Sequence, residues 1–313
     1  MKRLILLLST LALGVVLQAG PSSAVSLGIQ VDPVASSVRV GGFLYVTGTA
    51  PLLRTVVLQI LRGGVWTTIS SPSGSGARFA FRVPTYYDGT RVLRVTAPQG
   101  LLGEIDSATI TVHVRPTYTP AGTAGQHKLV GNGYRWNPCA PIRYHVDYAG
   151  VRSGNLELIR QALTRVRAAT GLSFVYAGRS TRVPFSNSWY ARTPTSGLYF
   201  AWSTPAQVPA IRGLVGLGGE SRLVDTAAGS HVITTGGVLL ARSAWPHMRS
   251  GWHNGIDRGS LLLHEIGHAM GLMHVTSKTE IMHPSLGGWT RPRYGAGDLA
   301  GLERLGMDQG CLP

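Results

Sequence analysis

Between residues 25 and 114, short apolar runs alternate with turn-forming residues. Seven of these runs are rich in β-branched and aromatic side chains, and glycine, proline, serine or aspartate separates most of them. Runs of this kind are typical of strands, and their close spacing favours two antiparallel sheets packed face to face. We therefore predict an all-β sandwich over 25–114, with strands at 38–40, 43–47, 56–61, 66–69, 79–83, 91–95 and 108–112.

The pattern changes after residue 114. Residues 115–128 are rich in proline, glycine and threonine and predict a linker, so we expect few contacts between the parts on either side of it. From residue 129 onwards helical and strand periodicities alternate, which predicts an α+β domain over 129–313. Its helices are expected from Asn155 to Thr170, from Asp257 or Ser260 onwards, and at 298–305. Its strands are expected at 142–148, 172–176, 198–202, 231–234 and 237–241, the last two as a hairpin.

The first residues read as an export signal. Lys2 and Arg3 precede an apolar run over 4–16, and small residues follow up to Ala24. This order predicts a signal peptide over 1–24 and a secreted, extracellular protein. The alternative is an uncleaved anchor, but the run is shorter than the roughly 20 residues that a spanning helix needs. No later stretch is apolar for long enough, so we expect no stable membrane span.

Charge and cysteine content add two expectations. The chain has 29 Lys and Arg against 14 Asp and Glu, which can favour acidic extracellular or cell-wall polymers. The arginines are scattered, so we expect no nucleic-acid partner, and GC-rich coding explains the arginine excess equally well. Cys139 and Cys311 are the only cysteines. In an exported chain such a pair predicts a disulfide; the alternative is that Cys139 is a thiolate that blocks a metal ion.

One short segment carries the chemistry. His264, Glu265, His268, Gly271 and His274 form the pattern HExxHxxGxxH. On a helix, His264 and His268 lie one turn apart on the same face, where two imidazoles can bind Zn²⁺ at about 2.0–2.1 Å. A glycine ends the helix and turns the chain, so that His274 can become the third ligand. Three protein ligands leave one position for water, as in catalytic zinc sites.

This segment, with Met282 eighteen residues after its start, resembles the metzincin metallopeptidases, and most closely the matrixin branch. The order of elements over 129–313 is similar to that of the metzincin (zincin-like) catalytic domain. The N-terminal part loosely resembles the immunoglobulin-like modules of secreted bacterial proteins. The resemblance therefore implies a multidomain protein with an all-β sandwich and a metzincin catalytic domain.

The resemblance also implies roles for individual residues. Glu265 would be the general base, and Met282 would form an apolar floor below the zinc. The run Val238, Leu239, Leu240 and Ala241 would be the edge strand that binds an extended substrate, although it also fits an ordinary core strand. Residues 284–294 would form the wall of the S1′ pocket, with Arg291 and Arg293 at its rim. The acidic residues expected for structural calcium are not recognisable between 190 and 243, so calcium is doubtful.

Three functions are compatible with these features. The first is a secreted, monomeric zinc endopeptidase that acts on proteins or peptides. The second is a non-catalytic adhesion or wall-binding protein with a structural zinc, although such sites more often have a fourth protein ligand. The third is a zinc amidase that acts on cell-wall peptides.

Overall fold

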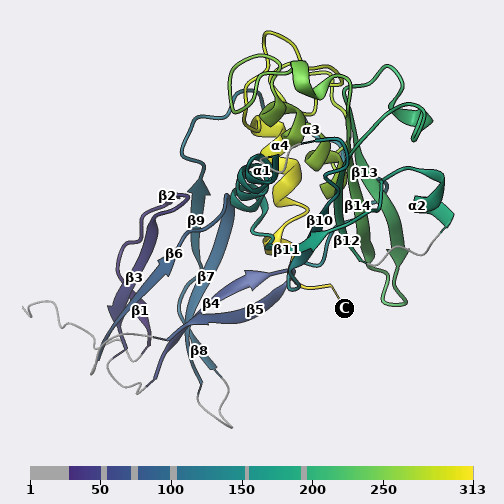
Figure 1. Ribbon diagram of the computed structural model, residues 1–313. Coiled ribbons are helices and arrows are strands. Elements are labelled where there is room, and N and C mark those ends of the chain that lie inside the picture. The colour runs from purple at the N-terminus through teal and green to yellow at the C-terminus, as the bar shows by residue number, and fades with distance from the viewer. Residues whose placement is uncertain are drawn as a thin grey trace, which may run out of the picture.

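The computed structural model describes residues 28–50, 55–71, 77–98, 104–151, 155–191 and 196–312. It has a β-rich N-terminal region and an α+β C-terminal region, connected by residues 116–128 (Figure 1). The predicted signal peptide lies outside the described residues. Within the described ranges, no helix is both long and apolar enough to cross a membrane.

The N-terminal region contains two sheets. One has three strands in the order β1-β3-β6, and the other has the order β2-β9-β7-β4-β5, with β8 paired to β7. All pairs are antiparallel except β2 with β9. The bounds are β1 Gln30–Val31, β2 Ser37–Arg39, β3 Phe43–Thr49, β4 Val57–Arg62, β5 Val65–Ser70, β6 Arg78–Pro84, β7 Gly89–Pro98, β8 Glu104–Asp106 and β9 Ile110–Arg115.

Both sheets contribute to one apolar core. Alternate residues of β3 and β6 pack against alternate residues of β4, β7 and β9, as expected when one face of each sheet is buried. The central side chains are Leu44, Val46, Leu58, Ile60, Phe79, Phe81, Leu93, Val95 and Val112. The seven predicted strands are present with shifted ends, and β1 and β8 are short additions that the sequence pattern did not indicate.

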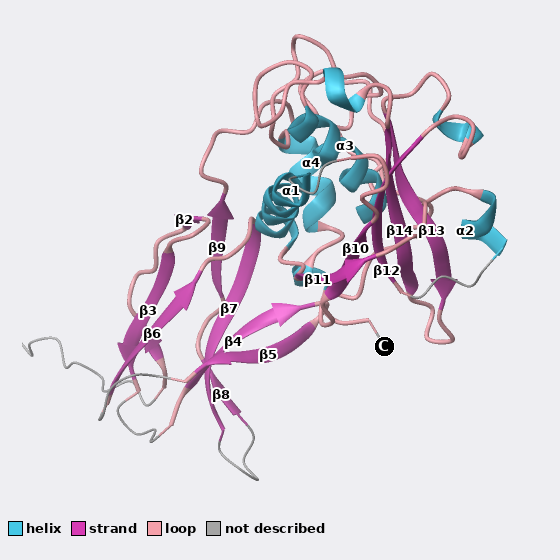
Figure 2. Ribbon diagram, in the orientation of Figure 1, coloured by secondary structure: helices cyan, strands magenta, loops and turns pink. Residues whose placement is uncertain are grey.

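The C-terminal region is built on a five-stranded sheet in the order β11-β10-β12-β14-β13. Every pair is parallel except β13 with β14. Helices α1, α3 and α4 lie together on one side of this sheet (Figure 2). The strands are β10 Ile142–Val146, β11 Phe174–Arg179, β12 Gly197–Ser203, β13 Gly216–Asp225 and β14 His231–Ala241. The helices are α1 Asn155–Thr170, α2 Asn187–Ala191, α3 Arg258–Met270 and α4 Ala296–Glu303, with short 3₁₀ turns η2 Pro209–Ile211, η3 Trp245–His247 and η4 Met307–Gln309.

Helix α1 has the predicted bounds because its sequence contains both a buried face and a stop. Leu158, Ile159, Leu163 and Val166 are buried, and they recur at the helical spacing. Gly171 follows at a φ of 75°, a left-handed conformation that a side chain disfavours. The last helix, α4, lies two residues earlier than the predicted 298–305.

The prediction of a hairpin over 231–241 is wrong. These residues form a single strand, β14, which pairs with β12 on one side and β13 on the other. Val238, Leu239, Leu240 and Ala241 therefore lie in the interior of the sheet and are not the predicted edge strand. The edge is β13, whose first residues belong to the glycine-rich stretch at 213–219. Glycine lowers strand propensity, so the sequence pattern did not indicate a strand there.

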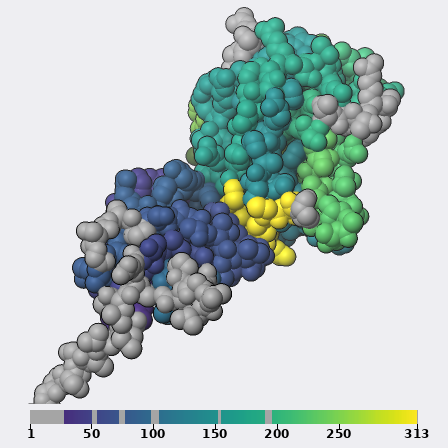
Figure 3. Space-filling view, turned by 90° about the horizontal axis from the view of Figure 1, so that it is seen from below, coloured from purple at the N-terminus to yellow at the C-terminus, as the bar shows by residue number. Residues whose placement is uncertain are grey.

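The expectation of few contacts between the two regions is also wrong. Asp308 of η4 forms an ion pair with Arg91 of β7, accepts a hydrogen bond from the Tyr87 hydroxyl at 2.9 Å, and through its backbone carbonyl accepts the amide of Gly63 at 3.0 Å. The Thr90 amide donates to Glu303 Oε1 at 2.7 Å. Figure 3 shows the C-terminal segment, in yellow, between the N-terminal region, in blue, and the teal and green part of the C-terminal region.

The segment predicted as a linker is attached to the C-terminal region along its length. The Tyr118 hydroxyl donates to the carbonyl of Tyr294 at 2.9 Å, and the amide of Ala296 donates to the carbonyl of Ala121 at 2.7 Å. Near its end, the amide of Met273 donates to the carbonyl of Lys128 at 2.8 Å. These bonds hold the segment in place although its composition is that of a loop. Its backbone hydrogen-bonding groups are satisfied by neighbouring segments of the same chain as well as they would be by water.

Candidate metal centre

Helix α3 positions the three histidines. It begins after Asp257, whose side chain accepts a hydrogen bond from the amide of Ser260 at 2.6 Å. This bond satisfies one of the free amides at the helix start. The helix ends at Gly271, which has a φ of 111°. The left-handed turn at Gly271 reverses the chain and brings His274 over the helix face that carries His264 and His268.

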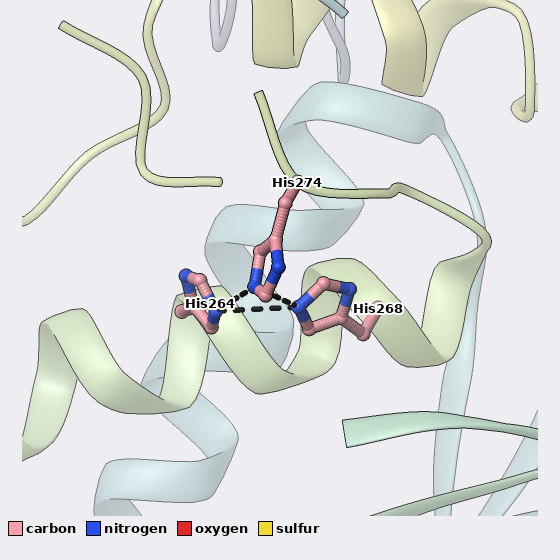
Figure 4. A group of neighbouring side chains, drawn as sticks. All are labelled: His264, His268 and His274. Carbon is pink, nitrogen blue, oxygen red and sulfur yellow. Dashed lines mark hydrogen bonds between the residues drawn. The ribbon is translucent and has the colours of Figure 1, made fainter. Parts of the chain in front are cut away.

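The three imidazoles converge at their Nε2 atoms (Figure 4). The Nε2 of His264 lies 3.2 Å from that of His268 and 3.2 Å from that of His274, and the last two are 3.0 Å apart. Three nitrogens bound tetrahedrally to zinc at 2.0–2.1 Å are roughly 3.3 Å from one another, so the donor set fits this ion. Within the described ranges, this is the one group of three or more potential metal-binding side chains that lie within ligand distance of each other.

The other ring nitrogens determine which atoms can bind a metal. His264 Nδ1 donates to the carbonyl of Ile281 at 2.7 Å, and His268 Nδ1 donates to the carbonyl of Leu272 at 2.8 Å. A carbonyl can only accept, so the proton is on Nδ1 and the Nε2 lone pair is free. Burial lowers the pKa of His264 to about 3 and that of His268 to about 4, which keeps both rings neutral, as a metal requires.

Glu265 lies beside this group and is 4% exposed. Burial raises the pKa of its carboxyl group to about 8, and a hydrogen bond from the backbone amide of Gly218 opposes the rise. The edge strand β13 packs so closely on Glu265 that a Cβ at Gly216 or Gly218 would collide with it. The glycines of 213–219 are therefore the sequence signal for this contact, but the signal does not show which segment they face.

Met282 lies below the metal helix. It is buried, and a Cβ at Gly267 of α3 would collide with its sulfur atom. The buried carboxylate of Asp298 holds the turn at Ile281 and Met282, because it accepts hydrogen bonds from their amides at 2.6 Å and 3.3 Å. It also accepts the amide of Gly295 at 2.9 Å. The same Ile281 holds His264 through its carbonyl group. Asp298 thus positions the turn and, through it, a histidine, a role that the sequence analysis did not assign.

A cleft of about 650 Å³ passes over the histidines. One side is formed by β13 and the other by α3 and the residues after Met282. Its lining comprises Phe185, Gly213, Leu214, Val215, Gly216, Leu217, Gly218, Gly219, Glu220, Ile256, Leu261, His264, Glu265, His268, Met273, His274, Pro284, Ser285 and Leu286.

The predicted basic rim is absent from this lining. Arg293 lies instead over the ring of Tyr118, with its Cζ 5.0 Å from the ring centroid. Tyr294 is buried and donates to the carbonyl of Leu263 at 3.1 Å, so it supports α3 from below. Of the predicted wall, the part that reaches the cleft is Pro284, Ser285 and Leu286.

The two cysteines are joined. Cys139 and Cys311 form a disulfide that links residues 172 positions apart. The alternative in which Cys139 is a zinc-blocking thiolate is therefore wrong. The disulfide connects the segment before β10 to the C-terminal segment that follows η4.

Comparison with known proteins places this centre in a family. Residues 152–305 match the family model of the matrixins. A 56-residue segment is 38% identical to a protein of Trichoplusia ni ascovirus 2c named "Putative matrix metalloproteinase", and it covers 18% of this chain and 11% of that protein. The chain thus spans about a tenth of the length of this relative. At family level the C-terminal region is a metallopeptidase domain. More narrowly, it is a matrixin-like metzincin domain.

Solved structures show only weak likeness. The PKD domain of an M14-like peptidase from Thermoplasmatales archaeon SCGC AB-540-F20 is 22% identical, with a TM-score of 0.20 over 28% of this chain and 93% of that chain. The fibronectin(III)-like modules of Clostridium thermocellum CbhA are 20% identical, with a TM-score of 0.23 over 37% of this chain and 56% of theirs.

Proposed function

We propose that the protein is a secreted zinc-dependent endopeptidase. The observation that carries the proposal is the convergence of three neutral imidazole nitrogens beside the buried carboxyl group of Glu265, at the base of an open cleft. The matrixin match over 152–305 supports the same reaction class. Protein or peptide substrates follow from that class, and we propose that the enzyme acts as a monomer.

His264, His268 and His274 would hold the zinc ion. When bound, zinc lowers the pKa of water to about 7 and polarises the scissile carbonyl group. Glu265 takes the proton from the attacking water and passes it to the leaving amine. The amide of Gly218 orients the Glu265 carboxylate and favours its ionised form.

Strand β13 would bind the substrate. Its pairing with β14 leaves its other edge without a partner strand within the described residues. An extended peptide can add to such an edge through backbone hydrogen bonds. Leu214, Val215, Ile256 and Leu286 line the cleft and offer it apolar surface. We assign this surface to the S1′ pocket and propose that it takes an apolar side chain from the C-terminal side of the scissile bond.

We propose that 25–114 is an immunoglobulin-like sandwich, 115–128 a docked connection and 129–313 the catalytic domain, exported by the signal over 1–24. The shared core of the two N-terminal sheets supports the sandwich. The sandwich contacts α1, α4 and η4, whereas β13, whose residues line the cleft, is the far edge strand of the sheet (Figure 1). It would therefore localise or stabilise the enzyme rather than cover the cleft.

The substitution Glu265→Ala tests the reaction. We expect it to retain zinc and lose about 10²–10⁴-fold in kcat/KM, the usual contribution of a general base. The measurement is cleavage of a denatured protein and of purified cell-wall peptides, with bound zinc measured on the same samples. Cleavage of wall fragments alone would indicate the amidase. Bound zinc without cleavage of either substrate would indicate a non-catalytic binding protein.

A further inference from the structure

Glu220 is the acidic residue of the cleft that the proposed reaction does not use. It is half-buried on β13, where it pairs with Gly236 of β14. The lining of the cleft contains two carboxylates, those of Glu220 and Glu265, and no Arg or Lys. This is unexpected in a chain with 29 Lys and Arg and only 14 Asp and Glu. The cleft lining therefore lacks the cationic side chains that are common elsewhere in the chain.

The side chain of Glu220 faces the metal side of the strand. A Cβ at Gly216 or Gly218 would meet Glu265, and alternate residues of a strand point to the same face, so Glu220 follows on that face. Its cross-strand partner is a glycine, which provides no side chain to cover the carboxylate. The pairing becomes irregular immediately after Glu220, between it and Arg222. Such a bulge redirects side chains next to active sites.

The carboxylate of Glu220 has no cationic partner among the described residues. Burial raises its pKa, and no neighbouring Arg or Lys contributes to lowering it. A half-buried carboxylate without a cation is unfavourable until a ligand provides one. A positively charged substrate group would therefore gain more interaction free energy beside Glu220 than beside a carboxylate on the open surface.

We propose that Glu220 selects substrates with an arginine or lysine side chain on the N-terminal side of the scissile bond. This inference rests on the proposed peptidase function. Leu214 and Val215, which offer apolar surface to the cleft, precede the contact of β13 with Glu265 along the chain, and Glu220 follows it. The two therefore lie on opposite sides of Glu265 along the strand. Glu220 is two residues beyond Gly218, which is level with Glu265. A peptide that pairs antiparallel to β13 runs with its N-terminal residues beside the later residues of the strand. At about 3.4 Å per residue, its residue about two positions before the cleaved bond would lie level with Glu220.

The test uses the mature, zinc-loaded protein and fluorogenic peptides that differ at one position. Arginine, lysine, citrulline and glutamate are placed in turn at each of the three residues before the cleaved bond. We expect arginine and lysine to exceed citrulline about tenfold in kcat/KM at one position, as for a partly shielded ion pair. Glu220→Gln should reduce this ratio to about one, and Glu220→Lys should favour glutamate. Because each ratio is measured on one variant, changes in general activity cancel.

Glu157→Gln is the matched control. It removes the same charge from the exposed surface of α1, outside the cleft, and should leave the arginine-to-citrulline ratio unchanged. Anisotropy of labelled, uncleaved peptides on the Glu265→Ala protein separates this proposal from the proposed function. Preferential binding of arginine peptides without cleavage by the parent protein would contradict only the peptidase function. Cleavage by the parent with a ratio near one at all three positions, or a ratio that survives Glu220→Gln, would overturn the role of Glu220.

Discussion

The metal centre and the contact between the two regions both bury a carboxyl group, but the two groups have different partners. Glu265 has one hydrogen bond, from the amide of Gly218, and no cationic side chain raises the fraction of its ionised form. Asp308 is held by Arg91 and by the hydroxyl of Tyr87, and burial still raises its pKa. Because no cation holds Glu265 in its ionised form, its carboxyl group can exchange a proton, whereas Asp308 serves a structural contact.

The substitution Gly218→Ala tests the metal-centre side of this comparison and should give the largest effect of the four changes, a loss of activity. The new methyl group would collide with the backbone of Glu265, so β13 and α3 must separate. A misplacement of about 1 Å at a reacting group can cost roughly 10²-fold in rate, and we expect at least that loss in kcat/KM. Gly288→Ala is the control, because nothing lies within 4 Å of a Cβ there. Equal activity of the two variants would mean that the strand does not set the position of Glu265.

The substitution Asp308→Ala tests the contact between the two regions and should lower the stability of the protein. It leaves the guanidinium of Arg91, only 9% exposed, without its carboxylate. Removing one partner of a buried ion pair costs about 3–5 kcal/mol, and we expect about 3 because Arg91 keeps the carbonyl of Tyr87 at 2.7 Å. Urea unfolding measures the loss. Bound zinc should stay at one per chain, and a lower zinc content would show that the contact also shapes the metal centre.

Removing the disulfide tests how far it supports the contact made by Asp308. The double substitution Cys139→Ser and Cys311→Ser removes the covalent restraint on the residues that follow η4, which keep hydrogen bonds from Arg135 and Asn137. We expect the free energy of unfolding to fall by about 2–4 kcal/mol, the usual range for a native disulfide. If Asp308 depends on this restraint, adding Asp308→Ala to the serine pair should cost less than it does alone. A strictly additive result would mean that the two restraints are independent.

The smallest effect concerns Asp88, in the same contact. Burial, and then the charge of Glu303, raise its pKa from 3.8 to about 6, although Arg91 and Arg115 act in the opposite direction. Between pH 4 and 6 the folded state therefore binds more protons than the unfolded state, so the contribution of Asp88 to stability falls as pH rises through this window. Asp88→Asn should stabilise the protein by about 1–2 kcal/mol at pH 7.5 and by almost nothing at pH 4. A gain of equal size at both pH values would rule out titration of Asp88 as the cause.

The parts that could be predicted from sequence are those in which the responsible residues are close in the chain. The bounds of α1 and the start of α3 follow from a buried face, a cap and a terminal glycine within about five turns of helix. The interior position of 238–241 could not be predicted in the same way. An apolar run fits an edge strand or a central one equally well, and only the pairing partners decide between them.

The ligands of the metal centre follow from residues that are close in the chain. His264 and His268 are one helical turn apart, and Gly271 turns the chain for His274, so local geometry alone brings three nitrogens together. Three other features depend on tertiary packing: β13 covers Glu265, Asp298 holds the turn at Met282, and Asp308 docks the two regions. Tyr87 and Asp308 are 221 positions apart, and no periodicity in the chain records a contact at that distance. Such contacts depend on how whole sheets and helices pack, which is settled by the burial of many residues together.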